Sequence, residues 1–574
     1  MNRRLHIFVA VVFSIVGYSQ QITGIVIEAD SELPIPGATI LLKDKSLGTN
    51  TDFDGKFTLD NVSDGDIITI SSIGFISKEV LIESQLNYII ELNEDVAKLD
   101  EVVVMGYGTQ LKKEVTGAVS IVGSETIEKV KPTRVEQALQ GKVAGVNITS
   151  QSGSPGGGLD IRIRGISTNG DNRPLILVDG NVIEELSVLN PSDIASITVL
   201  KDASAGIYGT RASNGVILIT TKTGKRATPL KLEYNNYFGF QETTRILPVL
   251  NATEYILMTN ESFGAGGKEL PYPNITDFGQ GTNWQKEVFQ KAPISNHDVS
   301  VRGGGNKSTY SVGFSAFDQD GIVGGEKASF KRLTGRINYN VEIFDNLNIK
   351  ANFIYANTKR KTLPENSIGS LLYNAINMPP NLSAYNYYTG DYTRATDLGN
   401  EVVNPLKQKD LSLNLTTADR FSGVFGLKYN ILPELNVEAN YQGNYTEVFG
   451  QYFSPTSDYG AEGVFGDKVF DRQDPGYYQP LDIYRDYTVD ILVNYEREFA
   501  EKHDVKFTIG NSIFRTFADG FGVSAEGLPN IDRIEDVKLG DASIVTPRFI
   551  NVDNRFSDSR LLSYFSRFRY SYDD

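Results

Sequence analysis

The chain has 574 residues, of which 40% are hydrophobic and 22% charged, so it is too apolar for a disordered chain and too polar for a helical membrane protein. The absence of cysteine excludes disulfide scaffolds and thiol catalysis, and a formal net charge of −16 argues against nucleic-acid binding. The three histidines, His6, His297 and His503, are too widely spaced for a helical zinc motif, and we predict no metal site, no cofactor and no enzymatic activity.

The N-terminus has the pattern of an export signal. Arg3 and Arg4 give a positive start, an apolar stretch follows at 7–16, and small residues precede a cut before Gln20. We predict residues 1–19 as a secretory signal peptide; the alternative is a buried N-terminal helix or strand. No second apolar run of 18 or more residues follows, so insertion into a membrane would require a barrel.

Residues 20–95 alternate short β-prone runs with turn signals, which predicts a β-sandwich with strands at 22–27, 38–42, 56–59, 67–70, 75–81 and 88–92. Asp52-x-Asp54-Gly55 is similar to the opening of a calcium-binding loop. Ser63 occupies the position of the required glutamate, however, and a hairpin turn is favoured. The segment resembles the carboxypeptidase-regulatory-like domain, which is not catalytic, in the motifs Gly24-x-Val26, Pro36-Gly37-Ala38-Thr39 and Ser72-x-Gly74-Phe75.

Residues 96–110 form a predicted linker that contains a β-prone run. Three valines in a linker offer an unpaired strand to a sheet edge, either as a strand of a neighbouring domain or as a segment captured by β-augmentation. The run resembles the TonB box of SusC-like outer-membrane receptors, which implies that it binds the periplasmic domain of TonB. Its residues are Asp100, Glu101, Val102, Val103 and Val104, followed by Met105-Gly106-Tyr107-Gly108.

Residues 111–228 read as a mixed α+β domain rich in Gly, Val, Ile, Ala and Thr, and Tyr208 is the only aromatic residue between Lys113 and Gly224. Few aromatic side chains mean less apolar burial per residue and a domain that can open locally. Arg162 and Arg164 alternate on one predicted strand, where they either pair with acidic residues of a surrounding wall or face solvent.

Several stretches of this domain, 139–146, 161–165, 174–180, 197–209 and 214–222, resemble the plug of TonB-dependent receptors. The Lys-Asp-Ala sequence at 201–203 resembles the form of this motif in the SusC-like branch of these receptors. The resemblance nominates as plug-motif residues Arg162, Arg164, Gly165, Asp179, Gly180, Lys201, Asp202, Tyr208 and Gly209.

Residues 229–574 contain 51 aromatic residues, against nine in residues 1–228, and alternate apolar with polar residues over long runs such as 332–343 and 435–446. Membrane strands need about 9–11 residues, apolar outside and polar inside, whereas soluble strands average about five to six. We predict ten such strands, which start near Lys231, His297, Ser308, Lys331, Leu347, Asp419, Leu435, Thr488, His503 and Arg560.

The predicted links alternate between long and short. The short links are 305–307, 345–346, 433–434 and 500–502, and the long set is 244–296, 322–330, 361–418, 450–487 and 520–559. This alternation is typical of an outer-membrane barrel, and a propeller or sandwich is the alternative. SusC-like receptors close a barrel of 22 strands, so the expected fold is mainly β: a sandwich, a plug and the first ten or so strands of that barrel, with the chain a fragment of the whole.

The resemblance implies active import of a nutrient, an oligosaccharide or a peptide, across the outer membrane. The implied partners are TonB, a SusD-like lipoprotein and outer-membrane lipid. Three alternatives to import remain. A surface adhesion protein would need neither a plug nor a TonB box, and an inactive fragment would share the ancestry of a transporter but not its activity. A secreted hydrolase is disfavoured, because Gly522-x-Ser524-x-x-Gly527 misses the spacing of a nucleophile elbow by one residue. Tyr385, Tyr387, Tyr388 and Tyr392 either stack on sugar rings or, as favoured, pack within a loop; the sequence leaves the substrate site unassigned.

Overall fold

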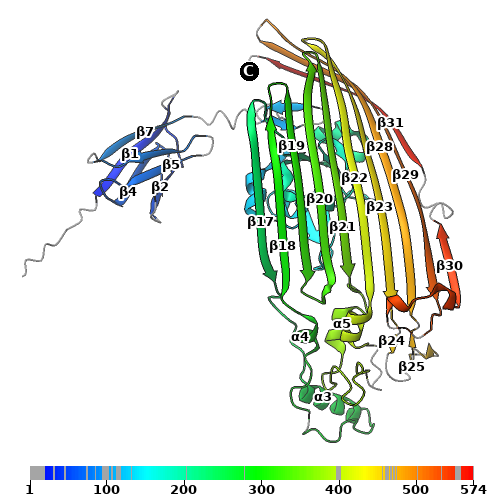
Figure 1. Cartoon of the computed structure of the whole chain (residues 1–574). Helices are drawn as coiled ribbons and strands as arrows, with labels where there is room; N and C mark the ends of the chain where they lie inside the picture. Colours follow the sequence, from blue (N-terminus) through cyan, green and yellow to red (C-terminus); the bar gives the residue numbers. More distant parts are fainter. Residues whose placement is uncertain are drawn as a thin grey trace, which may run out of the picture. The chain divides into compact units, whose positions relative to one another are not determined.

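The chain forms two compact units, residues 1–116 and 117–574, in a computed structural model (Figure 1). The structure describes residues 20–572 apart from 30–32, 44–46, 73–74, 84–85, 94–101, 105–107, 112–117, 131, 202, 277, 396–401, 456, 459–463, 466–467, 470–471, 474, 501, 530, 532 and 550–557. The predicted signal peptide, 1–19, therefore lies outside the described residues.

The first unit contains the predicted β-sandwich. Alternate residues of its strands point into one apolar core, in which Ile22, Ile40, Ile68, Ile70 and Leu92 are fully buried. One sheet has the order β4 (Lys56–Val62), β1 (Gln20–Glu28), β7 (Asn87–Leu92), and the other has the order β3 (Gly48–Asn50), β2 (Thr39–Leu42), β5 (Ile67–Ser71), β6 (Lys78–Leu81).

The Asp52-x-Asp54-Gly55 motif forms a hairpin turn. One carboxylate oxygen of Asp52 accepts hydrogen bonds from the backbone N–H groups of Asp54 at 3.0 Å and Lys56 at 2.8 Å. Gly55 adopts φ +72°, which glycine reaches without a steric penalty. The carboxylate thus holds the turn together, in agreement with the favoured interpretation.

The second unit begins with the predicted α+β domain, which we call the plug. Its mixed five-stranded sheet packs against short helices around an apolar core that includes Ile127, Val135, Leu139, Ile197 and Ile217. The sheet order is β10 (Val119–Gly123), β15 (Ile194–Leu200), β16 (Val216–Thr221), β13 (Leu175–Val178), β14 (Asn181–Val182). The other elements are the hairpin β11 (Val146–Ser150) and β12 (Leu159–Ile163), and the helices α2 (Ser124–Val130), η2 (Val135–Leu139), η3 (Leu186–Val188), η4 (Pro191–Asp193) and η5 (Ala203–Ala212).

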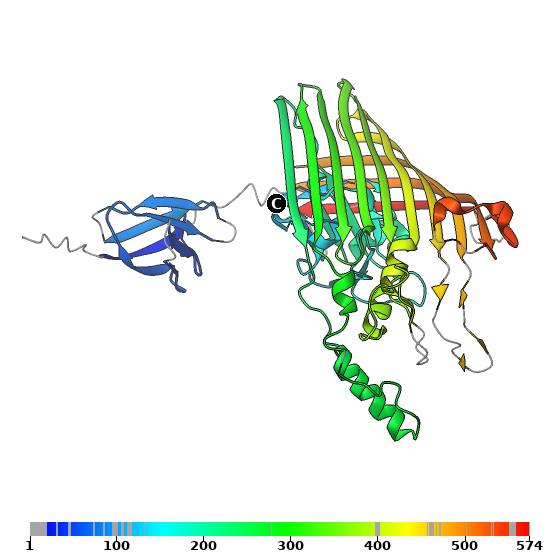
Figure 2. The same cartoon turned by 60° about the horizontal axis from the view of Figure 1, so that its bottom comes forward.

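A curved antiparallel sheet of eleven strands surrounds one side of the plug (Figures 1 and 2). In sheet order the strands are β17 (Thr228–Gln241), β18 (Ala292–Gly304), β19 (Ser308–Gly321), β20 (Gly325–Phe344), β21 (Leu347–Thr362), β22 (Leu413–Leu432), β23 (Leu435–Ser454), β28 (Gly476–Phe499) and β29 (His503–Glu526), after which β30 (Ile544–Phe549) and β31 (Ser559–Tyr572) both pair with β29.

All ten predicted strands are present in this sheet, and the four short links lie at the predicted residues. Several strands are longer than predicted: β28 begins at Gly476 instead of Thr488, and β20 begins at Gly325 instead of Lys331. Backbone pairing with a long neighbour extends a strand past the part in which apolar and polar residues alternate. The short strand β30 was not predicted, and it pairs with the far end of β29.

The two faces of the large sheet have the polarity of a membrane barrel. On β20, Arg332 and Arg336 face the plug and are 3% exposed, whereas Leu333 and Ile337 on the opposite face are 53% and 48% exposed. A soluble sheet buries its apolar face, so this reversed pattern fits strands that contact lipid outside and a polar interior within.

The long links gather at one end of the sheet and carry helices (Figure 1). There Trp284, Leu371, Met378 and Leu406 form a small apolar cluster, and Trp284 Nε1 donates a hydrogen bond to the Pro379 carbonyl at 3.0 Å. Within the described part of the chain, every helix is too short or too polar to cross a membrane. The α-helices described in these links are α3 (Ala252–Ala265), α4 (Trp284–Val288), α5 (Leu371–Asn377) and α6 (Pro405–Leu411), and the link after β29 contains the short helices η6 (Ile534–Asp536) and η7 (Leu539–Asp541).

Candidate functional site: the interface between plug and sheet

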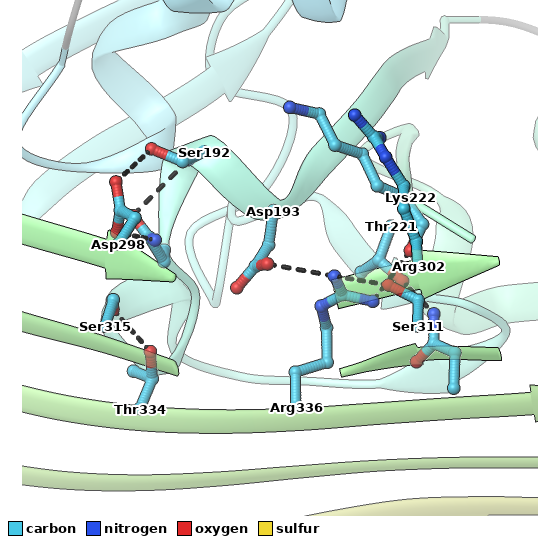
Figure 3. A network of polar contacts seen from close by, with 12 residues as sticks. Ser192, Asp193, Thr221, Lys222, Asp298, Arg302, Ser311, Ser315, Thr334 and Arg336 are labelled. Carbon is cyan, nitrogen blue, oxygen red and sulfur yellow. Dashed lines mark hydrogen bonds and ion pairs between the residues drawn. The ribbon is translucent and has the colours of Figure 1, made fainter. Parts of the chain in front are cut away.

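The segment around η4 presents three polar side chains to the sheet. Asn190 caps η4 by accepting a hydrogen bond from the Ser192 N–H, and Pro191 occupies the first helical position, as the Asn-Pro sequence favours. Asp298 on β18 accepts hydrogen bonds from Asn190 Nδ2 and from Ser192 Oγ, the latter at 2.7 Å (Figure 3). Asn296 on the same strand adds a third donor at 2.8 Å, so the buried carboxylate of Asp298 is well satisfied.

A buried ion pair lies beside this contact. Arg336 on β20 donates from Nη2 to Asp193 Oδ1 at 2.9 Å and from Nη1 to the Lys222 carbonyl at 2.7 Å (Figure 3). The side chains of Arg336 and Asp193 are 3% and 13% exposed. Removing one partner of a buried pair leaves the other charge uncompensated, at a cost of about 3–5 kcal/mol. This pair therefore fixes where the end of β16 sits against the sheet.

The turn Asp179-Gly180 belongs to the same interface. Both residues have positive φ, +50° and +95°, as a two-residue hairpin turn between β13 and β14 requires. The Asp179 carboxylate accepts hydrogen bonds from Thr221 N–H at 2.9 Å and Thr221 Oγ1 at 2.6 Å, and the Asn338 amide lies 2.6 Å from Thr221 Oγ1. Burial raises the pKa of Asp179, and the hydrogen bonds from Thr221 oppose that shift.

A second group of contacts joins the plug to later strands. Arg420 on β22 donates to Glu185 Oε2 at 2.6 Å, and Glu185 is 47% exposed. Asn181 Nδ2 donates to Asn444 Oδ1 on β23 at 2.8 Å, and the Arg211 guanidinium lies 4.3 Å from the Phe514 ring centre on β29. The plug is thus in polar contact with both halves of the described sheet.

The glycine-rich loop 151–158 of the plug is attached to β21. Arg360 donates from Nε to the Pro155 carbonyl at 3.0 Å and from Nη2 to Ser154 Oγ at 2.9 Å. Gly156 packs directly on the Phe330 ring, because a Cβ atom at this position would lie 2.3 Å from it. Glycine is therefore required here both for the close approach and for φ +63°.

Among the predicted plug-motif residues, the arginines differ most from expectation. Arg162 pairs with Asp160 on its own strand at 2.6 Å, whereas the sequence left open pairing with an acidic residue of the wall or exposure to solvent. Asp160 is closer because residues two apart share one face of a strand. Arg164 and Gly165 form a turn with φ +58° and +94°, and the Arg164 side chain is exposed.

The remaining predicted residues lie inside the plug or outside the described part. Lys201 Nζ donates to Ser120 Oγ at 2.8 Å and to the Ala144 carbonyl at 2.6 Å, which ties three plug segments together. Tyr208 is half-buried in η5, and Gly209 breaks that helix with φ +69°. Asp202 lies outside the described residues.

The predicted TonB box is described in part, since Asp100 and Glu101 also lie outside the described residues. The three valines form β8 (Val102–Val104), which pairs antiparallel with β9 (Thr109–Leu111). The β-prone character expected from the sequence is therefore confirmed for this run.

Sequence reasoning did not nominate Asn190, Ser192, Asp193, Asp298 or Arg336. Two signals were available: the Asn-Pro helix start and the alternation that placed Arg336 on the inward face. Neither signal says which plug residue meets which strand, because that depends on how the plug is seated. The assembled interface combines these hydrogen bonds and ion pairs with an apolar contact of Ile354 and Ala356 on the plug core, and its polar contacts can be exchanged for water.

Two segments match known families. Residues 111–216 match the TonB-dependent Receptor Plug Domain, and residues 22–104 match the CarboxypepD_reg-like domain. A solved structure of the RagAB peptide importer in the open-open state shares the fold, with a TM-score of 0.66 and 24% identity over 82% of this chain and 55% of that chain. The plug match and the similar fold of the surrounding sheet give the class that the chain resembles, the TonB-dependent receptors.

Sequence relatives narrow the class. The chain is 36% identical over 479 residues to the TonB-dependent receptor SusC of Bacteroides thetaiotaomicron, which covers 77% of this chain and 46% of SusC. It is 31% identical over 572 residues to the TonB-dependent receptor P26 of Formosa agariphila, which covers 97% of this chain and 55% of P26. The chain is a SusC-like TonB-dependent receptor sequence and spans about half the length of these relatives.

Proposed function

We propose that the chain belongs to a TonB-dependent importer that carries a nutrient, an oligosaccharide or a peptide, across the outer membrane. The observation that carries the proposal is the polar seating of the plug within a sheet whose strands have an apolar outer face. Such a plug blocks the interior and can be displaced without exposing a large apolar surface. Transport of this kind needs no covalent chemistry in the chain.

We infer that TonB binds the segment Asp100–Val104 by adding a strand to its own sheet. The β8 strand supports this inference, because a paired strand of three valines already has the extended backbone that β-augmentation uses. Along the chain β10 is the first strand of the plug sheet after the linker, and it is an edge strand, so a pull on the linker acts on that edge first. The plug-motif residues Arg162 to Gly209 then serve to keep the plug folded until the pull arrives.

We also propose a SusD-like lipoprotein as partner and the outer membrane as location. The long links with their helices support a partner on that end of the sheet, and the RagAB peptide importer is an assembly with a similar fold. Export to that membrane requires a signal, which we assign to residues 1–19. The proposed organisation is then a sandwich at 20–95, a TonB box and linker at 96–110, a plug at 111–228 and barrel strands at 229–574.

Deletion of residues 100–105 tests this function. We expect the deletion to abolish energy-dependent uptake of the nutrient, because TonB loses its attachment, while the receptor still inserts in the outer membrane. Uptake by whole cells and heat-modifiable migration of the barrel measure the two properties. Removal of 20–95 is the control, since that sandwich has its own core, and it should leave insertion intact. Normal uptake after deletion of 100–105 would contradict the TonB-box assignment.

A further inference from the structure

A polar cavity of about 700 Å³ lies between the plug and the first strands of the large sheet. Its wall includes η2, the glycine-rich loop 151–158, Gln241 at the end of β17 and Gln319 near the end of β19. Both strands end on the side of the sheet that carries the long links, so the cavity lies at that end of the plug. Sites for small ligands have volumes of about 300–1,000 Å³.

The chemistry of this cavity differs from that of the whole chain. The net charge of the chain is −16, yet no aspartate or glutamate is among the described residues that line the cavity. The lining contains two cations, Arg134 and Lys142, and four amides, Gln137, Gln140, Gln241 and Gln319. Aromatic side chains are likewise missing from this described lining, and its apolar side chains are Val130, Pro132 and Leu159.

Two of these residues have donors available for a ligand. Arg134 is held by Glu136 at 2.7 Å and by the Gly156 carbonyl at 3.2 Å, so its charge is already paired and Lys142 is the unpaired cation of the described lining. The exposed ammonium group of Lys142 makes no hydrogen bond or ion pair with another described residue, while its backbone N–H donates to the Leu139 carbonyl at 3.1 Å. The carbonyl oxygen of Gln137 accepts from Thr133 and Arg134, which leaves the amide nitrogen of Gln137 to donate.

We propose that this cavity binds an acidic oligosaccharide, one whose sugar rings carry carboxylate or sulfate groups. The proposal rests on the import function proposed above and names its substrate class. Lys142 supplies a charge-assisted hydrogen bond to the anionic group, and the amides and serines of the wall bond the hydroxyl groups. A neutral sugar gains nothing from the cation, and the described wall offers the side chains of a peptide no aromatic surface and only Val130, Pro132 and Leu159 as apolar partners.

The test is a calorimetric titration of the complete receptor in detergent with trigalacturonic acid and with the neutral galactotriose. We expect the acid to bind at least about tenfold more tightly, with an affinity that falls as salt is added. Lys142→Gln should weaken binding of the acid about tenfold, since it removes a hydrogen bond to a charged group. Lys129→Gln is the matched control, because Lys129 is an exposed plug lysine outside the cavity that pairs with Glu125 at 2.7 Å.

Equal binding of the two trisaccharides, binding of neither, or an unchanged affinity in Lys142→Gln would overturn the proposal. Uptake assays separate this outcome from failure of the import function. If TonB-dependent uptake of a neutral nutrient is observed and Lys142→Gln does not change it, the proposed substrate class is wrong but the import function stands. If trigalacturonic acid binds but no TonB-dependent uptake is observed, the binding site stands and the import function is wrong.

Discussion

In the N-terminal sandwich, Ile22, Ile40 and Ile70 are fully buried among apolar neighbours, whereas the interface between plug and large sheet buries Asp298 and Arg336. An apolar core opens only by exposing its surface to water, at about 25 cal/mol for each Å². A hydrogen bond across an interface contributes only about 0.5–1.5 kcal/mol net, because water replaces the lost partner. The difference indicates that the sandwich resists opening, whereas the plug can separate from the large sheet at a lower cost in free energy.

The largest expected effect comes from the buried ion pair. Arg336→Leu leaves Asp193 buried without its partner and should destabilise the seating of the plug by about 4 kcal/mol. The urea concentration at which the receptor becomes a conducting channel in a planar bilayer measures this seating. The same change at Lys331, which faces outward on β20 in an exposed pair with Asp318, is the control and should leave the midpoint in place.

The double variant Arg336→Leu with Asp193→Leu sharpens this result. Because both charges are then gone, most of the lost stability should return. An unchanged midpoint in Arg336→Leu alone would show that apolar contacts seat the plug, such as those of Ile354 and Ala356 with the plug core. The plug interface would then be held by apolar contacts, as the core of the sandwich is, and the two regions would not differ in this respect.

A somewhat smaller effect is expected in the sandwich. Ile70→Ala removes buried methyl groups at a site with 0% exposure and should cost about 3 kcal/mol of unfolding free energy. Calorimetry of the receptor should show an earlier transition for the sandwich and no change in channel opening by urea. Ile89→Ala, at a position 74% exposed on β7, is the matched control and should change stability by no more than about 0.5 kcal/mol.

The smallest effect is expected at the exposed edge of the interface. Glu185→Gln weakens the pair with Arg420, but Glu185 is 47% exposed, so solvent and salt already screen it. We expect a loss of about 0.5 kcal/mol or less in the same bilayer measurement. A loss of seating stability as large as that of Arg336→Leu would mean that the exposure of a polar contact does not determine how much the contact stabilises the plug.

Much of the fold could be predicted from local patterns. The ten strands were recognised and the turns at 305–307, 345–346, 433–434 and 500–502 were placed correctly, although β20 and β28 begin earlier than predicted, because alternation and turn residues act over a few positions. The site was predicted less well, since a motif indicates a domain and not its contacts. The sequence left Arg162 either to pair with the wall or to face solvent, and in the structure it pairs with its strand neighbour Asp160 at 2.6 Å.

The sequence by itself determined the inward and outward faces of β20, the sandwich core and the extended character of Val102–Val104, because each depends on periodicity or propensity within one segment. Only the tertiary structure decided that Asp193 meets Arg336 and that Gly156 rests on Phe330. Those pairs lie more than 140 residues apart, and their contact depends on how one folded body is seated within another. No local rule of sequence contains that information.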